Sequence, residues 1–310
     1  LETLDHNEDT IVIAQTIDDT RAQFNRRLVV QWAYQYAISN GLDIASTISL
    51  NKIANPSFWQ AQYPKEHVGL MECREYGWNK LREYVKDGRL HIKDTTHGPT
   101  LVLLERLVNK VQKENPNCKI VVALDNFHKL QDFASLDERS SVMRKSQFLK
   151  TNIAQGYGTT VFATFEYGKV ETGKRPTNND LRDAVNIEYD INYLINLFSP
   201  LKTAQDFGKG DECDLWHGTE YARLPIVEGV VGKNKITEEK DGIRYFAFYP
   251  AQSRYECLAP KDMETIVSNN RSLKAEVEGH DGYWKDGKHY SNVLRNKESN
   301  ILSNPLMNVY

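Results

Sequence analysis

The sequence from residue 11 to residue 50 reads IVIAQTIDDTRAQFNRRLVVQWAYQYAISNGLDIASTISL, and it decides the fold class of the chain. Residues 11–14 form a short apolar run, as in a buried strand. Large residues then recur at every fourth position, as on one face of a helix: Phe24, Leu28, Trp32 and Tyr36. Gly41 is expected to end that helix, and a second β-rich run follows at 44–50. This order of strand, helix and strand predicts an α/β protein.

The same alternation continues towards the C-terminus. Further apolar runs predict strands at 120–124, 159–165, 191–198, 225–231 and 243–249. Helical patterns precede the first two of them, one beginning at Pro99 and one covering 142–153. A charged turn that ends at Asp241 and Gly242 separates the last two runs, which predicts a hairpin. We therefore expect a three-layer core with a mostly parallel central sheet and a C-terminal β-hairpin.

Composition narrows the function classes. The chain has 310 residues, with 39 basic against 42 acidic side chains, so any contact with nucleic acid is expected to be local. Its four cysteines lie far apart and lack metal-binding spacing: Cys73, Cys118, Cys213 and Cys257. No apolar run approaches the length of a membrane span. We expect reduced thiols, a cytoplasmic location, no metal site and no membrane contact.

The sequence also predicts a domain boundary. After Pro260 the chain becomes polar and shows little apolar periodicity. We therefore predict one core domain over residues 1–260 and a polar, partly ordered tail over 261–310. The first residue, Leu1, leaves open whether an N-terminal domain precedes this chain.

One stretch carries a family resemblance. Residues 174–190 read KRPTNNDLRDAVNIEYD, in which Arg-Pro precedes Asp-Leu-Arg and then Ile-Glu and Asp. This stretch resembles the DnaB-type replicative helicases. Other motifs of that family follow in the same order: Ser49 and Leu50 after the second predicted strand, Asp125 after the third, and Lys-Asn-Lys at 233–235, where the family has Lys-Asn-Arg. The resemblance spans roughly residues 10–257, and it implies a RecA-like ATPase core, assembled as a ring around single-stranded DNA in a bacterial or phage-infected cell.

The phosphate-binding loop of that family is degenerate in this chain. Such a loop reads Gly-x-x-x-x-Gly-Lys-Ser/Thr, because glycines let consecutive amides wrap the phosphates. Residues 15–22 read QTIDDTRA, without either glycine and with two carboxylates, Asp18 and Asp19, where a triphosphate would arrive. The remnant of the loop is Thr20, Arg21 and Ala22, and Ala22 has no hydroxyl to bind magnesium. By the resemblance, Asp125 remains as the Walker B aspartate.

Three further positions depart from what the resemblance implies. Asn51 stands where the water-activating glutamate follows the second strand, Glu166 where the γ-phosphate sensor is usually Gln, and Lys235 where the hairpin carries an arginine finger. An amide cannot act as a general base, and lysine lacks the bidentate fork of arginine. We expect no catalysis and no bound ATP or magnesium. The alternative is that the loop is misplaced, although no other Gly-rich loop precedes a helix.

Basic residues between the fourth and fifth predicted strands are candidates for DNA binding. By the resemblance, this span corresponds to the pore loops of the ring, and it contains Lys169, Lys174, Arg175 and Arg182. Such side chains can make charge-assisted contacts with phosphates. Val185 replaces the glycine whose backbone approaches DNA in the family. The alternative is a solvated basic loop.

Three functions fit this sequence. The first is a non-catalytic scaffold or regulator of DNA replication, which assembles with itself or with related helicase subunits and replication proteins and binds single-stranded DNA. The second is an active ATP-dependent 5'-3' DNA helicase subunit with an unorthodox nucleotide site. The third is an interaction module outside replication, since a fold alone does not fix function. Nucleotide affinity separates the first two, and the partners recovered with the protein separate the first from the third.

Overall fold

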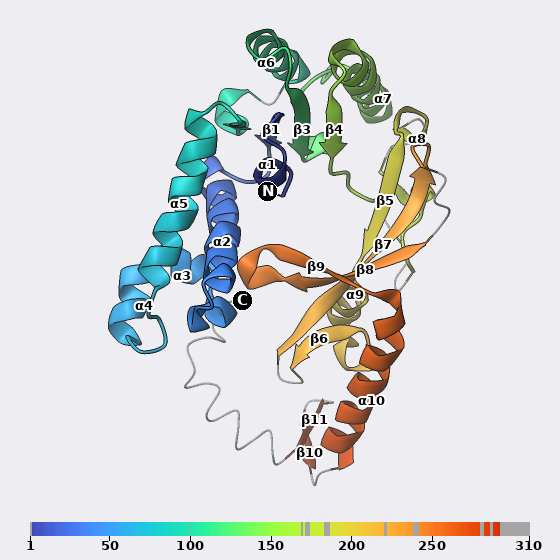
Figure 1. The fold of residues 1–310 in the computed structure, drawn as a ribbon. Helices are drawn as coiled ribbons and strands as arrows, with labels where there is room; N and C mark the ends of the chain where they lie inside the picture. The colour runs from blue at the N-terminus through green and yellow to red at the C-terminus, as the bar shows by residue number, and fades with distance from the viewer. Residues whose placement is uncertain are drawn as a thin grey trace. The chain divides into compact units, whose positions relative to one another are not determined.

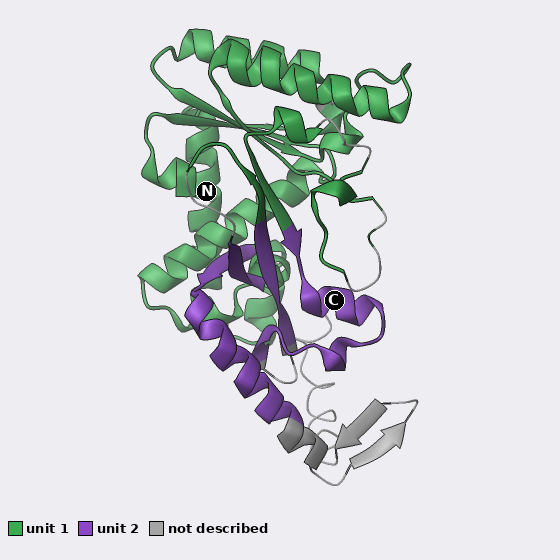
Figure 2. Cartoon of the chain, turned by 90° about the vertical axis from the view of Figure 1, so that its right-hand side faces the viewer, with its two compact units in different colours: residues 1–196, 231–241, 250–253 green, residues 197–230, 242–249, 254–310 purple. Residues whose placement is uncertain are grey.

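The structure is a computed structural model that describes residues 2–98, 100–168, 170, 174–182, 187–219, 222–237, 242–279, 282–285 and 288–291. The chain divides into two compact units, which Figure 2 colours separately. Unit 1 comprises Leu1–Asn196, Val231–Asp241 and Pro250–Ser253. Unit 2 comprises Leu197–Val230, Gly242–Tyr249 and Arg254–Tyr310.

Unit 1 is built on a four-stranded parallel sheet in the order β2-β1-β3-β4, of which β1, β3 and β4 are labelled in Figure 1. Its strands are β1 (Thr10–Thr16), β2 (Leu90–Lys93), β3 (Lys119–Asp125) and β4 (Thr160–Ala163). Side chains alternate across β1, so Ile11 and Ile13 enter one apolar core while Val12 packs against another. The first core includes residues of α6 (Leu101–Glu114) and the second includes residues of α2 (Arg21–Ser39). The predicted α/β fold with a parallel central sheet is confirmed.

Helix α2 follows β1 after a short turn, as predicted. Thr20 is its N-cap, and Thr20 and Gln23 form a capping box that closes its first turn. Beyond its last residue, Gly41 has a φ of 62° and donates its N–H to the carbonyl of Ile38 at 3.1 Å. Helix α5 (Leu70–Lys86) packs closely against α2, because a Cβ at Gly77 would lie only 2.5 Å from the carbonyl oxygen of Val29.

The prediction of a second strand at residues 44–50 is wrong. A 3-10 helix occupies Asp43–Thr47, and α3 (Leu50–Ala54) follows it with Ser49 as its N-cap. Ile44, Ala45 and Ile48 are buried in the core beside α2, so their apolar character reflects helix packing rather than a sheet. The second strand is β2, which pairs with β1. Helix α4 (Pro56–Gln62) follows α3.

The remaining helices of unit 1 frame the other strands. Helix α6 precedes β3, and α7 (Glu138–Phe148) continues into a π-helix over Leu149–Gln155 before β4, close to the predicted positions. Short helices are α1 (Glu2–His6) and α8 (Ile187–Asp190). Single 3-10 turns lie at Thr95–His97, Phe127–Lys129, Asn178–Asp180 and Pro250–Gln252.

A second, antiparallel sheet has the order β5-β7-β8-β9, with β6 paired to β7. Its strands are β5 (Tyr193–Phe198), β6 (Trp216–Thr219), β7 (Ala222–Asn234), β8 (Ile243–Tyr249) and β9 (Arg254–Leu258). Ile226 pairs with Ala247 and Val230 with Ile243, so the predicted hairpin is confirmed. The sequence did not predict β6 and β9, and the boundary between the two units crosses β5 and β7.

The rest of unit 2 includes α9 (Pro200–Asp206), 3-10 turns at Gly210–Glu212 and Pro260–Asp262, and α10 (Met263–Gly279), followed by β10 (Gly282–Lys285) and β11 (Lys288–Ser291). The sequence pattern predicts no helix in this segment, whereas the structure has α10 there. The side-chain amide of Asn270 on α10 donates to the carbonyls of Asp214 and Trp216, both at 2.9 Å. The domain boundary at residue 260 stays a prediction. Among the described residues, no helix is long and apolar enough to cross a membrane.

Candidate nucleotide site at the carboxyl edge of the parallel sheet

The carboxyl ends of the parallel strands of unit 1 meet at one edge of the sheet. Gln15 pairs with Lys93 and Thr16 with Asp125, so β1, β2 and β3 end next to each other. Ligands of open α/β sheets bind outside this edge. The turn before α2 begins here, directly after β1, which is where the sequence predicted the degenerate phosphate loop.

The turn between β1 and α2 is closed by hydrogen bonds within itself. The Thr16 hydroxyl donates to the carbonyl of Asp19 at 2.5 Å. The Thr20 N–H donates to Oε1 of Gln23 at 3.0 Å, and the Gln23 N–H donates to the Thr20 hydroxyl at 3.3 Å. These polar groups therefore face the chain itself and do not converge on an open cradle of amides.

Both carboxylates of this turn are paired with cations. Arg27 contacts Asp19 through two nitrogens, at 2.8 and 3.2 Å. Lys129, which follows β3, forms an ion pair with Asp18, and this hydrogen-bonded contact raises the pKa of the Lys129 ammonium. Two of the cations at this edge are thereby held by the chain's own carboxylates.

A carboxylate that the sequence analysis missed lies at the same edge. Asp94 directly follows β2 and is only 6% exposed. Its Oδ2 accepts the backbone N–H of Arg21, the first residue of α2, at 3.1 Å. Its Oδ1 accepts the N–H of Thr96 at 3.1 Å and the Thr96 hydroxyl at 2.6 Å.

The structure also corrects the prediction that Asn51 follows the second strand of the sheet. Asn51 lies in α3 and follows no strand, because the run at 44–50 is helical. The position that directly follows the second strand is Asp94. The sequence signal for this strand is the alternation of the apolar Leu90 and Ile92 with polar residues before an aspartate. A pattern of only four residues is a weak indication of a strand.

Asp125 lies where the sequence placed it, as the last residue of β3. Its Oδ1 accepts the hydroxyl of Thr164, whose N–H donates to the carbonyl of Leu124 at 3.0 Å. A side chain that follows β4 thus anchors the aspartate. Its role towards magnesium stays a prediction.

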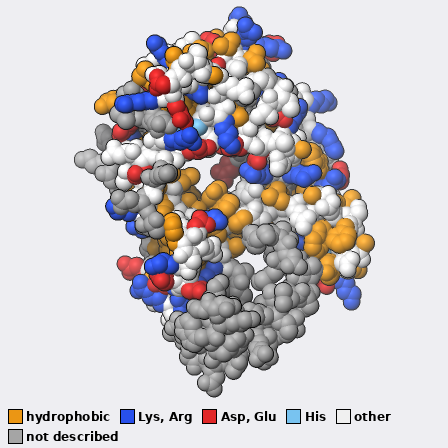
Figure 3. All heavy atoms as spheres, turned by 180° about the vertical axis from the view of Figure 1, so that it is seen from behind, with side chains coloured by type: hydrophobic (Ala, Val, Ile, Leu, Met, Phe, Trp, Pro, Cys, Tyr) orange, Lys and Arg blue, Asp and Glu red, His pale blue; other side chains and the backbone are white. Residues whose placement is uncertain are grey.

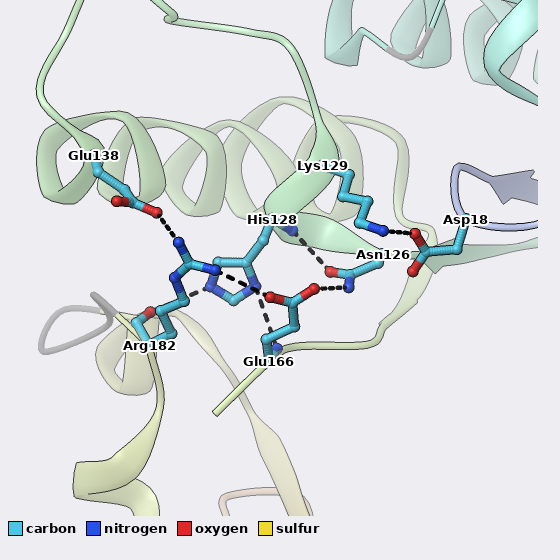
Figure 4. A network of polar contacts seen from close by, with 7 residues as sticks. All are labelled: Asp18, Asn126, His128, Lys129, Glu138, Glu166 and Arg182. Atoms are coloured by element: carbon cyan, nitrogen blue, oxygen red, sulfur yellow. Dashed lines mark hydrogen bonds and ion pairs between the residues drawn. The ribbon is translucent and has the colours of Figure 1, made fainter. Parts of the chain in front are cut away.

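The predicted sensor position Glu166 belongs to a network of polar side chains, drawn in Figure 4. One Glu166 oxygen accepts the side-chain amide of Asn126 at 2.6 Å, and the other contacts Arg182 at 3.2 Å. The Arg182 guanidinium also pairs with Glu138 on α7 at 2.8 Å. Both carboxylate oxygens of Glu166 are therefore engaged within unit 1.

His128 stands at the centre of this network (Figure 4). Its Nδ1 accepts the backbone N–H of Glu166, so Nδ1 carries no proton, and its Nε2 donates to the carbonyl of Arg182; both distances are 3.2 Å. The two contacts fit the imidazole tautomer that carries its proton on Nε2. Among the described residues, no cluster of three or more His, Cys, Asp or Glu side chains suits a metal ion.

The lysines of the hairpin are held by neighbouring backbone of unit 1. The Lys235 N–H donates to the carbonyl of Asn192 at 2.8 Å, and the Lys233 ammonium donates to the carbonyl of Glu188. Burial, together with the nearby Lys235 charge, lowers the pKa of Lys233. Lys235 follows the last residue of β7, at the expected end of the hairpin, and its role as a substitute for an arginine finger stays a prediction.

The predicted DNA-binding residues have different surroundings in the structure. Lys174 and Arg175 are exposed in a segment without regular structure, whereas Arg182 pairs with Glu166 and Glu138 at the carboxyl edge. Lys169 and Val185 lie outside the described residues.

These residues do not fit a magnesium-bound triphosphate. A triphosphate needs several converging N–H donors and nearby cations. Here the first amide of α2 faces Asp94, and Lys129 and Arg27 are held by Asp18 and Asp19.

Comparison with known proteins identifies the fold. No family model and no curated protein matches the sequence. Among solved structures, the ATPase domain of a DnaB-like helicase has a TM-score of 0.60 and 17% identity, and the match covers 82% of this chain and 76% of that one. A DnaB-like replicative helicase, described with its interactions with primase, has the same TM-score and identity; this chain covers 52% of it, about half its length. The predicted RecA-like fold, which is the fold of these helicase ATPase domains, is confirmed.

Proposed function

We propose that this chain, which has the fold of a DnaB-type helicase ATPase core, is a non-catalytic scaffold or regulator of DNA replication. The turn between β1 and α2 carries the proposal. It retains its place in the fold, but its polar groups serve contacts within the chain. A RecA-like core presents surfaces for assembly whether or not its own site turns over nucleotide.

Electrostatics oppose nucleotide binding at this turn. A triphosphate would have to displace Asp18 from Lys129 and Asp19 from Arg27, and the two freed carboxylates would then repel it. Arg21 lacks the lysine geometry of a phosphate loop, and Ala22 has no hydroxyl for magnesium. Binding and hydrolysis are therefore both disfavoured.

The proposed partners follow from the fold likeness. One of the similar structures is described with primase, and we propose that this chain likewise joins replication proteins, as an oligomer of itself or with related helicase subunits. Recovery of such proteins with the full chain from native lysate would support this assembly. A strict monomer at tens of micromolar in light scattering, with no replication protein recovered, would contradict it.

Single-stranded DNA is the proposed nucleic-acid partner. Lys174 and Arg175 are exposed in unit 1, while basic and acidic side chains lie interspersed on the described surface of the face in Figure 3. We expect weak binding that falls steeply with salt, because contacts with phosphates release counterions. Titration of a labelled oligonucleotide measures it, and charge reversal at both residues should abolish it. Equal binding by that variant would exclude this segment.

A second candidate function is an active ATP-dependent helicase subunit. Two carboxylates at the carboxyl edge favour it, since Asp94 follows β2 and Asp125 ends β3. A base near bound nucleotide and an aspartate near magnesium are what hydrolysis needs. The contacts of Asp94 with Arg21 and Thr96 speak against this function.

Calorimetric titration of the purified chain with magnesium and ATP tests the proposal. We expect no binding, and no phosphate release above background with or without single-stranded DNA. Asp125→Asn is the matched control, because any release that persists in this variant comes from a contaminant. Magnesium-dependent micromolar binding, or DNA-stimulated release that Asp125→Asn abolishes, would overturn the proposal.

A further inference from the structure

The N-terminus of α2 can attract an anion. This helix has 19 residues and begins directly beyond the carboxyl edge of the sheet. The first amides of a helix lack partners within it and carry a partial positive charge, so they attract anions. In this chain, the Arg21 amide donates to a carboxylate from another strand, and the Gln23 amide donates to the Thr20 hydroxyl.

The carboxylate that accepts the Arg21 amide belongs to Asp94, and neighbouring groups hold it in place. The residue lies one position beyond Lys93, which pairs with Gln15 of β1. Thr96 holds Oδ1 through its N–H and its hydroxyl, which leaves Oδ2 directed at the Arg21 amide. The carboxylate is buried, and it reaches α2 across 73 residues of sequence. The contact is therefore part of the tertiary structure, and not a local capping motif.

We propose that Asp94 is an internal anion that occupies the N-terminus of α2 and keeps phosphate out. A carboxylate oxygen and a phosphate oxygen accept the same kind of N–H, so one excludes the other at a single donor. This inference rests on the proposed non-catalytic function and adds a reason for it. The turn lacks the glycines of a phosphate loop, and the Asp94 carboxylate also occupies the Arg21 N–H that a phosphate would use.

Removal of Asp94 changes the charge balance at this edge. Asp18 and Asp19 are already paired with Lys129 and Arg27. Arg21 is exposed, and its guanidinium has no ion pair among the described residues. Without the Asp94 carboxylate, the backbone N–H of Arg21 would be left to donate to an incoming anion, and the same residue carries an exposed cation. We expect a chain of phosphoryl groups to be the ligand class that binds there.

Titration of the full chain with inorganic tripolyphosphate tests the proposal. We compare the wild type with Asp94→Ala and with Asp94→Asn, which preserves the shape and one acceptor. The expected affinity rises at least tenfold in Asp94→Ala and less in Asp94→Asn. Asp206→Ala is the matched control, since it also removes one carboxylate, from an exposed pair with Lys202 in unit 2, and it should not gain affinity.

The possible outcomes separate this inference from the proposed function. If both Asp94 variants are folded by circular dichroism and bind no more tripolyphosphate than wild type, the internal anion is overturned while the non-catalytic function stands. An equal gain in Asp206→Ala would mean a general charge effect and would also overturn it. If the wild type binds and hydrolyses ATP and Asp94→Asn abolishes hydrolysis, both ideas fail and Asp94 is a catalytic residue. Should Asp94→Ala not fold, Asp94→Asn alone decides.

Discussion

The two halves of the carboxyl edge are held in different ways. On the side of β1 and β2, a buried carboxylate, Asp94, accepts backbone amides from α2 and from its own loop. On the side of β3 and β4, partly exposed side chains pair with each other: the side chains of Arg182, Glu138 and Glu166 are 45%, 59% and 37% exposed. A buried contact with an amide costs more to break than an exposed ion pair. The Asp94 contact is therefore expected to be harder to break than the ion pairs of Arg182.

Asp94→Ala is the strongest test of the difference between the two halves of the edge. The variant leaves the Arg21 amide and the Thr96 hydroxyl without their acceptor, so we expect the free energy of unfolding to fall by about 1–3 kcal/mol, as for a buried hydrogen bond to a charged group. Urea denaturation followed by fluorescence measures it. Asp206→Ala, at an exposed pair, should change stability by less than about 0.5 kcal/mol. An equally small effect of Asp94→Ala would mean that the two halves do not differ.

Arg182→Gln probes the other half. It removes the ion pairs with Glu138 and Glu166, which are exposed and screened by salt. We expect a loss below about 1 kcal/mol at low ionic strength that shrinks as salt is added. Arg106→Gln, an exposed arginine of α6 without an ion pair among the described residues, is the control and should show no such salt dependence. A larger loss that salt does not reduce would show that this network is as fixed as the Asp94 contact.

The sequence predicted the strands that form the carboxyl edge better than the contacts between their side chains. The runs at β1 and β3 are long and apolar, and each is linked to a periodic helix, so their pattern indicates buried parallel strands without further help. The run at 44–50 has three β-branched residues in seven, as many as β3, yet it packs as short helices because Ile44 and Ile48 face the core beside α2. Burial in tertiary structure overrode local propensity there.

The same limit applies to the candidate site. Asp18, Asp19 and Asp125 could be placed, because each lies at or just beyond the end of a strand that the pattern indicates. The partner of the Arg21 N–H could not be predicted. Asp94 is distant from Arg21 in sequence, and it follows a four-residue strand that the sequence pattern did not indicate. Because β2 was not predicted, the expected catalytic position was wrongly assigned to Asn51. Contacts across the edge depend on which strands are neighbours, and no local pattern carries that information.

The smallest expected effect is a pH dependence at Lys129, which bridges the two halves by pairing with Asp18. That contact raises the pKa of the folded-state ammonium above its ordinary value, so its stabilisation is complete below the unfolded pKa and is lost as pH rises through the folded pKa. The loss should begin above about pH 10, near the ordinary lysine value. Lys129→Gln should remove this part of the alkaline decline in the urea midpoint, whereas Lys113→Gln, at an exposed lysine of α6, should leave it unchanged. Because Lys129 is exposed, the change should be small and should vanish at high salt; identical alkaline profiles for wild type and Lys129→Gln at low salt would mean that the two halves are not linked through Asp18.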